Sequence, residues 1–300
     1  MSATDRRLAE VGVLGVMVLW AGNFIVVKSA LAVIPPVGFT FLRFLLASAT
    51  LLVLLRWREG SIGLPRRDLI AMCLLGGLGF GVYQMLWTTG LTTVAAGDSA
   101  LIIAATPVLV ALLAVVARSD LLTPSKLAGV LVSFGGVAIV IASGPGLSLG
   151  GSIVGELVTL AAAVCWSIYT AFAGPFLRRI SPLRATAWAT VAGTVVLAPV
   201  AILQLGTVDL GHALPNAAGA IVYAGLLAAG ISNVIVLNGV KIVGPTRTAA
   251  LQFLVPALAV ILAAVFLQEA IRPGQILGGV VIVAGVILTR WRPTSVWRVA

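Results

Sequence analysis

Aromatic and amide side chains recur at helical spacing inside the apolar stretches of this 300-residue chain. Trp20 and Asn23 stand three residues apart, and Trp166 and Tyr169 repeat that spacing, so each pair lies on one face of a helix. Aromatic faces pack against apolar groups and attract ammonium groups, whereas amides hydrogen-bond both amines and carboxylates. The set therefore suits a small amphiphilic ligand. The candidate substrate-binding residues are Trp20, Asn23, Tyr83, Gln84, Trp87, Trp166, Tyr169 and Asn233.

The same residue types have a second common role in membrane proteins. Tryptophan and tyrosine form belts at the membrane interfaces, and amides hold transmembrane helices together. Tyr83 and Gln84, like Asn23, lie near the middle of an apolar stretch, where ligand binding is the slightly favoured interpretation. For the tryptophans and Tyr169 both roles stay open.

Two charges and two prolines inside apolar stretches are candidates for gating. Arg43 could bind a substrate carboxylate, form a buried pair with Asp98 or Glu10, or extend to an interface, and a structural or gating role is favoured. Asp98 is a candidate gating or proton-linked carboxylate, although an acid that starts a helix is the favoured interpretation. Pro107 and Pro256 each free the carbonyl four residues earlier, so they predict paired hinges, ligand-facing carbonyls, or kinks covered by neighbours.

The chain offers no set of residues for catalysis. It has one histidine, His212, and two cysteines, Cys73 and Cys165, both inside apolar runs. No glycine-rich stretch carries the Gly-Lys-Ser/Thr of a nucleotide-binding loop. We therefore expect no catalytic residue, no bound metal, no cofactor and no ATPase subunit, and we disfavour a membrane-embedded lipid-processing enzyme.

The composition excludes a water-soluble fold. Hydrophobic residues make up 60% of the chain and charged residues 9%, against roughly 25% charged in soluble proteins. The net charge of +10 does not indicate nucleic-acid binding, because the basic residues form short clusters between apolar runs. The fold class predicted is an all-α membrane protein.

Ten apolar stretches are long enough to cross a bilayer, which takes about 20 residues each. They run approximately over residues 9–30, 37–55, 69–88, 97–117, 127–143, 152–173, 183–203, 217–237, 246–267 and 274–290. The first is too long for a cleaved signal peptide and is interpreted as a retained span. With both termini in the cytoplasm, 16 of the 19 basic residues fall on the inner side. A multi-pass protein of the cytoplasmic (inner) membrane is expected.

The second half of the chain repeats the first. Pairs at an offset of 149 are Gly90 with Gly239, Pro107 with Pro256, Asp120 with Glu269, Pro124 with Pro273, Gly129 with Gly278 and Gly136 with Gly285. In the first helices the offset is 146, which pairs Trp20 with Trp166 and Arg43 with Ala189. Two units, 1–146 and 147–300, are predicted. Because each has five spans, they enter the membrane in opposite orientations.

These features resemble the EamA-type branch of the drug/metabolite transporter superfamily, most closely its YddG-type exporters of aromatic and other amino acids. The resemblance covers essentially the whole chain. It is carried by the five-plus-five inverted plan, by the acidic-x3-Pro stretches Asp120 to Pro124 and Glu269 to Pro273, and by the Glu-x9-Trp openings of both halves. It implies a central cavity lined by the first four helices of each half, with the fifth and tenth helices at the periphery.

The function expected from this resemblance is secondary transport out of the cell. Amino acids, aromatic and other neutral ones, would move by alternating access at the central cavity. The candidate residues lack the basic cluster that a phosphorylated substrate would need, which favours amino acids. The alternatives within transport are another small metabolite or a cationic drug.

Overall fold

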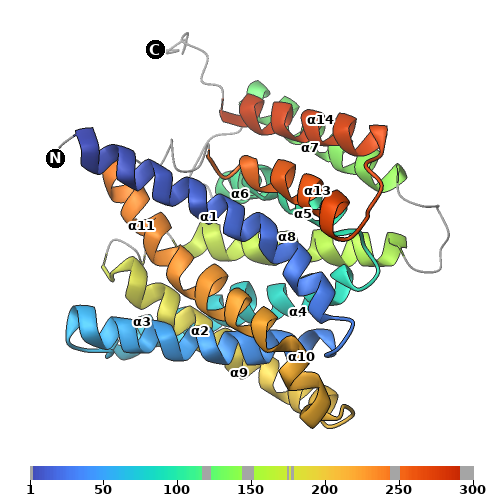
Figure 1. Ribbon diagram of the computed structural model, residues 1–300. Coiled ribbons are helices and arrows are strands. Elements are labelled where there is room, and N and C mark those ends of the chain that lie inside the picture. The colour runs from blue at the N-terminus through green and yellow to red at the C-terminus, as the bar shows by residue number, and fades with distance from the viewer. Residues whose placement is uncertain are drawn as a thin grey trace, which may run out of the picture.

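The computed structural model describes residues 3–116, 123–143, 152–173, 176, 179–243 and 251–290. Within these residues the chain forms helices and no strand, as the predicted all-α class requires. Figure 1 shows long helices packed side by side at several angles, with the N-terminal helix crossing the middle of the view.

The helices of the first half follow the predicted spans. They are α1 (Ala3–Ala30), α2 (Pro36–Glu59), α3 (Arg66–Gly76), η1 (Gly77–Val82), α4 (Tyr83–Leu91), α5 (Ala96–Ile103), α6 (Thr106–Val116) and α7 (Pro124–Ala142). Elements α3, η1 and α4 form one helix of 26 residues, in which η1 is a π-helical segment. Elements α5 and α6 form a second span that is interrupted by a turn before Thr106.

The second half has a corresponding series. Its helices are α8 (Ser152–Ala173), α9 (Pro182–Leu205), α10 (Leu210–Val222), η3 (Tyr223–Ile231), α11 (Ser232–Val243), α13 (Leu254–Phe266) and α14 (Pro273–Arg290). The segment η3 is again π-helical and lies within a continuous helix, as η1 does in the first half. Both halves therefore place a π-helical segment in their third predicted span.

Proline and glycine set the helix ends. Pro124 opens α7 and Pro182 opens α9, where the missing N–H costs nothing and the fixed φ suits a helix. The preceding residues, Thr123 and Ser181, are N-caps whose hydroxyls accept backbone N–H groups three residues on, at 3.3 and 3.1 Å. Gly60 ends α2 with a φ of 69°, a conformation that favours glycine.

Within the described residues, eight helices are long and apolar enough to cross a membrane, which shows a multi-pass membrane protein. The last two predicted spans coincide with shorter apolar helices, Leu254–Phe266 and Pro273–Thr289. Ten spans and cytoplasmic termini therefore stay predictions. Asp120 and the predicted boundary between the two units, at residue 146, lie outside the described residues.

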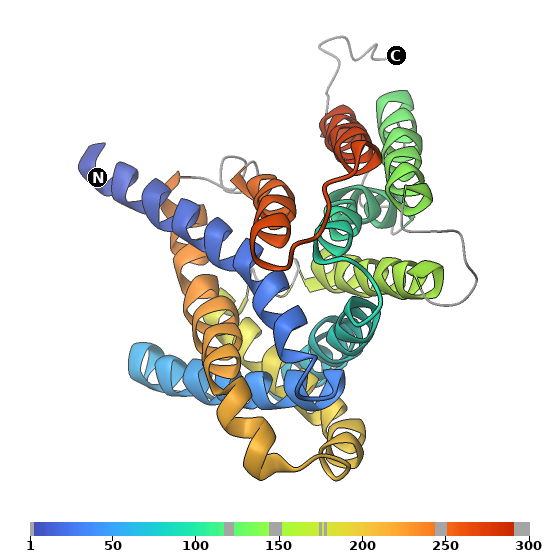
Figure 2. The same cartoon turned by 45° about the vertical axis from the view of Figure 1, so that its right-hand side comes forward.

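Helices α7 and α14 form a pair at one edge of the molecule (Figures 1 and 2). Gly129 lies against Gly285 and Gly136 against Gly278, so closely that an added Cβ would come within 2.8 Å of a facing backbone atom in each pair. The residue numbers run in opposite directions, so the two helices are antiparallel. Each contact is also the repeat counterpart of the other, which is the reciprocity that an inverted repeat requires.

A second reciprocal contact lies between the π-helical spans and the second span of the other half. A Cβ on Gly76 would lie 2.6 Å from the carbonyl oxygen of Ala189, and a Cβ on Gly225 would lie 2.5 Å from the carbonyl oxygen of Arg43. Gly76 and Gly225 correspond at the offset of 149, and Arg43 and Ala189 at 146. This contact therefore fixes the backbone that carries Arg43.

The α7–α14 contact predicts a sharp difference between two adjacent glycines. Gly136→Ala should lower the free energy of unfolding by about 1–3 kcal/mol, because the new methyl would overlap Ile282 and Gly278 across the interface. Gly135→Ala has open space and should leave the stability unchanged or raise it by up to about 1 kcal/mol. Thermal unfolding in detergent measures both, and equal effects would contradict the packing.

Candidate functional site

Arg43 carries a positive charge into the interior of the helical bundle. It is the eighth residue of α2, about 10 Å along the helix axis from its first residue, and only 2% of its surface is exposed. The close contact with Gly225 holds its backbone against η3. A guanidinium remains protonated at neutral pH, so the bundle encloses a cation.

Gln84 is the hydrogen-bonding partner of this cation, and three aromatic rings surround it. Nη2 of Arg43 donates to Oε1 of Gln84 at 2.5 Å. The guanidinium carbon lies 5.2 Å from the ring centroid of Phe44, 5.4 Å from that of Trp87 and 5.7 Å from that of Phe39. The rings stabilise the cation through their electron-rich faces. Its Nε–H has no hydrogen-bond partner.

Five aromatic rings form a connected group next to Arg43, which we call the aromatic cluster: Phe44, Phe80, Tyr83, Trp166 and Tyr169. Trp166 is central, with centroid distances of 5.5 Å to Phe80, 5.2 Å to Tyr83 and 5.3 Å to Tyr169. Phe80 lies 6.1 Å from Phe44, whose ring also faces the guanidinium. The cluster thus joins an apolar surface to a buried charge.

Glycine again permits the approach of the two halves at this cluster. Tyr169 of α8 lies directly on Gly79 of η1, where an added Cβ would come within 2.4 Å of the Tyr169 Cβ. Without that close approach, the rings from α8 could not reach Phe80 and Tyr83. The cluster is therefore built from both halves of the chain.

Five of the eight predicted substrate-binding residues come together here around Arg43. They are Tyr83, Gln84, Trp87, Trp166 and Tyr169. The sequence reasoning missed Phe39, Phe44 and Phe80, because phenylalanine in an apolar stretch looks like lipid-facing or core packing. A signal was present: Phe39 precedes Arg43 by four residues, and Phe80 precedes Gln84 by four, the spacing of one helix face.

The remaining three predicted residues contact η3 or lie near it. The Trp20 indole donates to the Ala228 carbonyl at 3.0 Å, and Asn233 donates through Nδ2 to the Ala229 carbonyl. Both side chains thus bind backbone carbonyls of the π-helical segment. Trp20 does so from another helix, whereas Asn233 binds the carbonyl four residues earlier in its own continuous helix. Asn23 differs, because its buried Oδ1 has no hydrogen-bond partner. The next residue, Phe24, contacts Trp87 at a centroid distance of 5.3 Å.

The paired prolines follow breaks in their spans. Pro107 is the second residue of α6 and Pro256 the third residue of α13, each just after a turn. The carbonyl of Ile103 accepts the Thr106 hydroxyl at 2.6 Å, and that of Gln252 accepts a backbone N–H at 3.1 Å. Both freed carbonyls already have protein donors, so the alternative in which neighbours cover the kinks fits this conformation.

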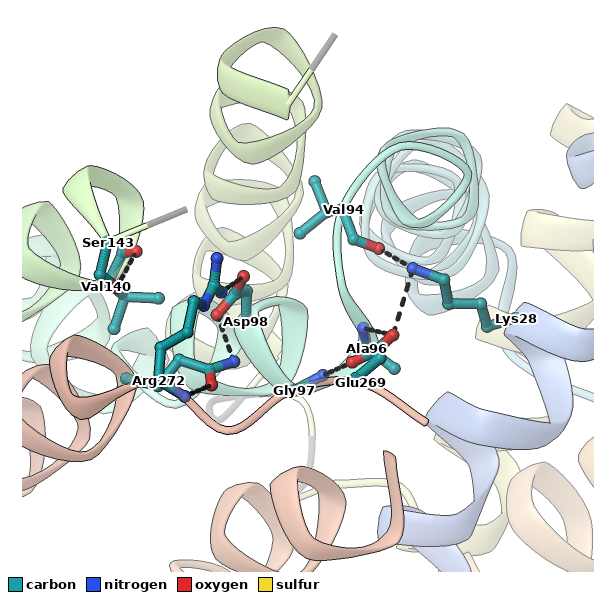
Figure 3. Close-up of polar contacts among 10 residues, drawn as sticks. Lys28, Val94, Ala96, Gly97, Asp98, Val140, Ser143, Glu269 and Arg272 are labelled. Carbon is teal, nitrogen blue, oxygen red and sulfur yellow. Dashed lines mark hydrogen bonds and ion pairs between the residues drawn. The ribbon is translucent and has the colours of Figure 1, made fainter. Parts of the chain in front are cut away.

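Charged residues gather at one end of the molecule, where α1 ends and α5 and α14 begin (Figure 3). Lys28 Nζ lies 3.4 Å from Oε1 of Glu269 and also donates to the Val94 carbonyl. The Glu269 carboxylate accepts the backbone N–H groups of Ala96 at 2.9 Å and Gly97 at 3.3 Å. A carboxylate at a helix N-terminus is favoured by the helix dipole, so Glu269 is held by both charge and backbone.

A second ion pair lies beside the first. Asp98, which is 1% exposed, accepts from Nη2 of Arg272 and from Nε2 of Gln275 at 2.7 Å. The sequence analysis had offered Asp98 as a partner for Arg43. The structure corrects this, because Asp98 pairs with Arg272, 174 residues away in the other half. We call Lys28, Glu269, Asp98, Arg272 and Gln275 the ion-pair network.

The network is linked to the residues around Arg43. The indole of Trp87, which faces the guanidinium, donates to the Ser99 hydroxyl at 3.1 Å. Ser99 follows Asp98 in α5. A rearrangement of the network therefore bears directly on a ring that contacts Arg43.

The Asp98–Arg272 pair yields a stability prediction. Asp98→Asn should lower the free energy of unfolding by about 3 kcal/mol, since it leaves a largely buried guanidinium without its counterion. Arg272→Gln should do the same, and a double-mutant cycle should give a coupling of at least about 1 kcal/mol. Arg179→Gln breaks a pair with Asp68 whose arginine is half exposed, and should cost less than about 1 kcal/mol. Thermal unfolding that shows additive effects at Asp98 and Arg272 would contradict the pairing.

Comparison with known proteins places the chain in a family. The sequence model of the EamA-like transporter family matches twice, at residues 7–142 and 153–291. A protein of Streptantibioticus cattleyicolor named a probable terminal-alkyne amino-acid exporter is 32% identical over 279 residues, which cover 92% of this chain and 91% of that protein. An uncharacterized transporter of Archaeoglobus fulgidus is 28% identical over 275 residues, 91% of this chain and 94% of its own.

A solved crystal structure shares the fold. It superposes with a TM-score of 0.65 over 95% of this chain and 97% of that one, at 20% sequence identity. The relatives are transporters and not enzymes. This chain belongs to the EamA-like transporter family.

Proposed function

We propose that this protein exports neutral amino acids, aromatic ones among them, across the cytoplasmic membrane. The observation that carries the proposal is the aromatic cluster beside a single buried cation, Arg43. Aromatic rings offer a surface for an apolar side chain. A lone positive charge attracts a substrate with one negative group and repels a cationic drug. The amino-acid exporter of S. cattleyicolor, at 32% identity, supports the same substrate class.

The remaining polar groups suit the other half of a zwitterion. The Oδ1 atom of Asn23 is a buried acceptor without a partner, as an ammonium group requires. Asn23 adjoins Phe24, which contacts Trp87, and Trp87 contacts Arg43. A carboxylate and an ammonium group could therefore be received within one neighbourhood.

The ion-pair network would act as a gate in alternating access. Its two pairs join α1 and the start of α5 to the connection between α13 and α14. In the predicted topology this end faces outward. Release of substrate on that side requires the pairs to separate, so the described conformation is closed outward. The side chains that must separate for the outer side to open are thus those of Lys28, Glu269, Asp98 and Arg272.

The proposed gate depends on the membrane topology. Ten spans in two inverted units, with both termini in the cytoplasm, are supported by the two family matches and by the reciprocal glycine contacts. The inverted plan allows one fold to adopt two related half-conformations, which expose a central site to one side and then to the other.

Reconstituted transport tests the substrate class. Purified protein in liposomes should accelerate the counterflow of labelled phenylalanine, and unlabelled neutral amino acids should compete with it. Protein-free liposomes are the control. If no amino acid moves while another solute class does, the proposed substrate is wrong.

The aromatic cluster predicts that one substitution weakens the transport of phenylalanine more than that of alanine. Trp166→Ala should raise the half-saturating concentration of phenylalanine by about tenfold, because it removes the central ring of the cluster. Alanine transport should change less, since its methyl group reaches fewer rings. Trp57→Ala, at a residue that is 75% exposed, is the matched control and should leave both substrates unaffected. Equal loss for both substrates at Trp166 would contradict a ring-binding role.

A further inference from the structure

We propose that Arg43 is the residue that binds the substrate carboxylate, through its unpartnered Nε edge. This inference rests on the proposed function, whose site it makes specific. From the sequence, a structural or gating role for Arg43 was favoured over substrate binding; the contacts of its side chain support substrate binding instead. The observations are its burial, its missing counterion and its free donor.

The missing counterion sets Arg43 apart from the other buried or half-buried cations. Ion pairs within the described residues include Lys28 with Glu269, Arg179 with Asp68, Arg184 with Glu59 and Arg272 with Asp98. Within that part of the chain, no carboxylate pairs with Arg43, and its side-chain partner is the neutral amide of Gln84. Burying a charge without a counterion costs free energy, which an anionic ligand would recover.

Arg43 has hydrogen-bond donors that such an anion could use. Nε–H is buried and makes no hydrogen bond, whereas Nη2 uses one of its two protons on Gln84. Phe39, Phe44 and Trp87 lie near the guanidinium and restrict how a ligand approaches it. A carboxylate that reaches the Nε edge can accept two parallel hydrogen bonds, the strongest arrangement for this pair.

Helix packing does not explain why position 43 carries an arginine side chain. Arg43 and its repeat counterpart Ala189 make equivalent close contacts, with Gly225 and Gly76 respectively. Both contacts are made by backbone atoms of residues 43 and 189, so neither depends on the side chain. The long charged side chain at position 43 therefore serves a purpose other than seating α2 on the π-helical segment.

The position of the aromatic cluster indicates which chemical group the ligand carries beside its carboxylate. Phe44 contacts both the guanidinium and Phe80, and Tyr83 is the neighbour of Gln84 in the chain. A carboxylate on Arg43 thus places an attached side chain toward these rings. The ligand class is a monocarboxylate whose apolar or aromatic group lies a few bonds away.

Binding of two small probes tests this assignment without relying on transport. The probes are 3-phenylpropanoate, which has the ring and the carboxylate, and phenethylamine, which has the ring and an ammonium group. Affinity for the purified wild-type protein in nanodiscs is measured by calorimetry. The wild type should bind 3-phenylpropanoate more tightly, and Arg43→Gln should weaken that binding by about 10- to 100-fold. Binding of phenethylamine should fall by less than about threefold or improve.

Two further variants control for misfolding and for the loss of an arginine elsewhere in the same helix. Arg43→Lys retains the charge but not the two-pronged geometry, so it should give an intermediate loss even if the glutamine variant does not fold. Arg58→Gln is the matched control, because Arg58 is an exposed arginine of the same helix that also lies over a tryptophan ring, at 5.2 Å from the Trp57 centroid. It should bind both probes as the wild type does.

The possible results separate this assignment from the substrate proposal. If the wild type binds neither probe or does not prefer the carboxylate, or if the Arg43 variants bind 3-phenylpropanoate normally, the assignment to Arg43 is overturned. If 3-phenylpropanoate binding depends on Arg43 while liposomes show no amino-acid flux, the carboxylate site stands and only the amino-acid claim fails.

Discussion

Close backbone contact between helices is the constraint on which this structure depends. Lipid chains are as apolar as the helix surfaces, so association relies on packing and on interhelical hydrogen bonds more than on apolar burial. Glycine allows backbones to touch at Gly129 and Gly136 in α7 and at Gly76 and Gly225 in the two π-helical spans. These contacts recur at equivalent positions of both halves. They hold the halves together and determine where every functional side chain can lie.

The two halves make nearly equivalent backbone contacts but contribute different side chains to the interior. The equivalent close contacts place Arg43 on one side and Ala189 on the other, so at this pair of positions the first half carries a cation and the second half carries a methyl group. The second half contributes Trp166 and Tyr169, whose rings reach Tyr83 of the first half. Charge from one unit and rings from the other meet in the interior, and a ligand that needs both would hold the units together.

Much of the fold could be predicted because its signals are local. Proline and glycine mark the helix ends, and apolar runs mark eight helices in the described part of the chain that are long enough to cross a membrane. Within the described residues, the ninth and tenth predicted spans coincide with shorter apolar helices, Leu254–Phe266 and Pro273–Thr289. The π-helical segments were not predictable, because their apolar, glycine-containing sequences differ little from those of ordinary transmembrane helices.

The site was predicted in part. Tyr83, Gln84 and Trp87 stand out as polar or aromatic residues at helical spacing, and the structure brings them to Arg43. Partnerships across the halves could not be read from the sequence. Asp98 binds Arg272 at a separation of 174 residues, and Trp20 binds the backbone carbonyl of Ala228 at a separation of 208 residues.

The proposed transport mechanism depends most on the opposite orientations of the two halves in the membrane. Ser61 and Thr207 are exposed loop residues that correspond at the offset of 146. In a variant without Cys73 and Cys165, single cysteines at these two positions can be labelled in intact cells with an impermeant maleimide. If the two halves have opposite orientations, the cysteine at position 207 should react from outside, and the cysteine at position 61 should react only after the membrane is opened. Reaction of both from the same side would contradict opposite orientations.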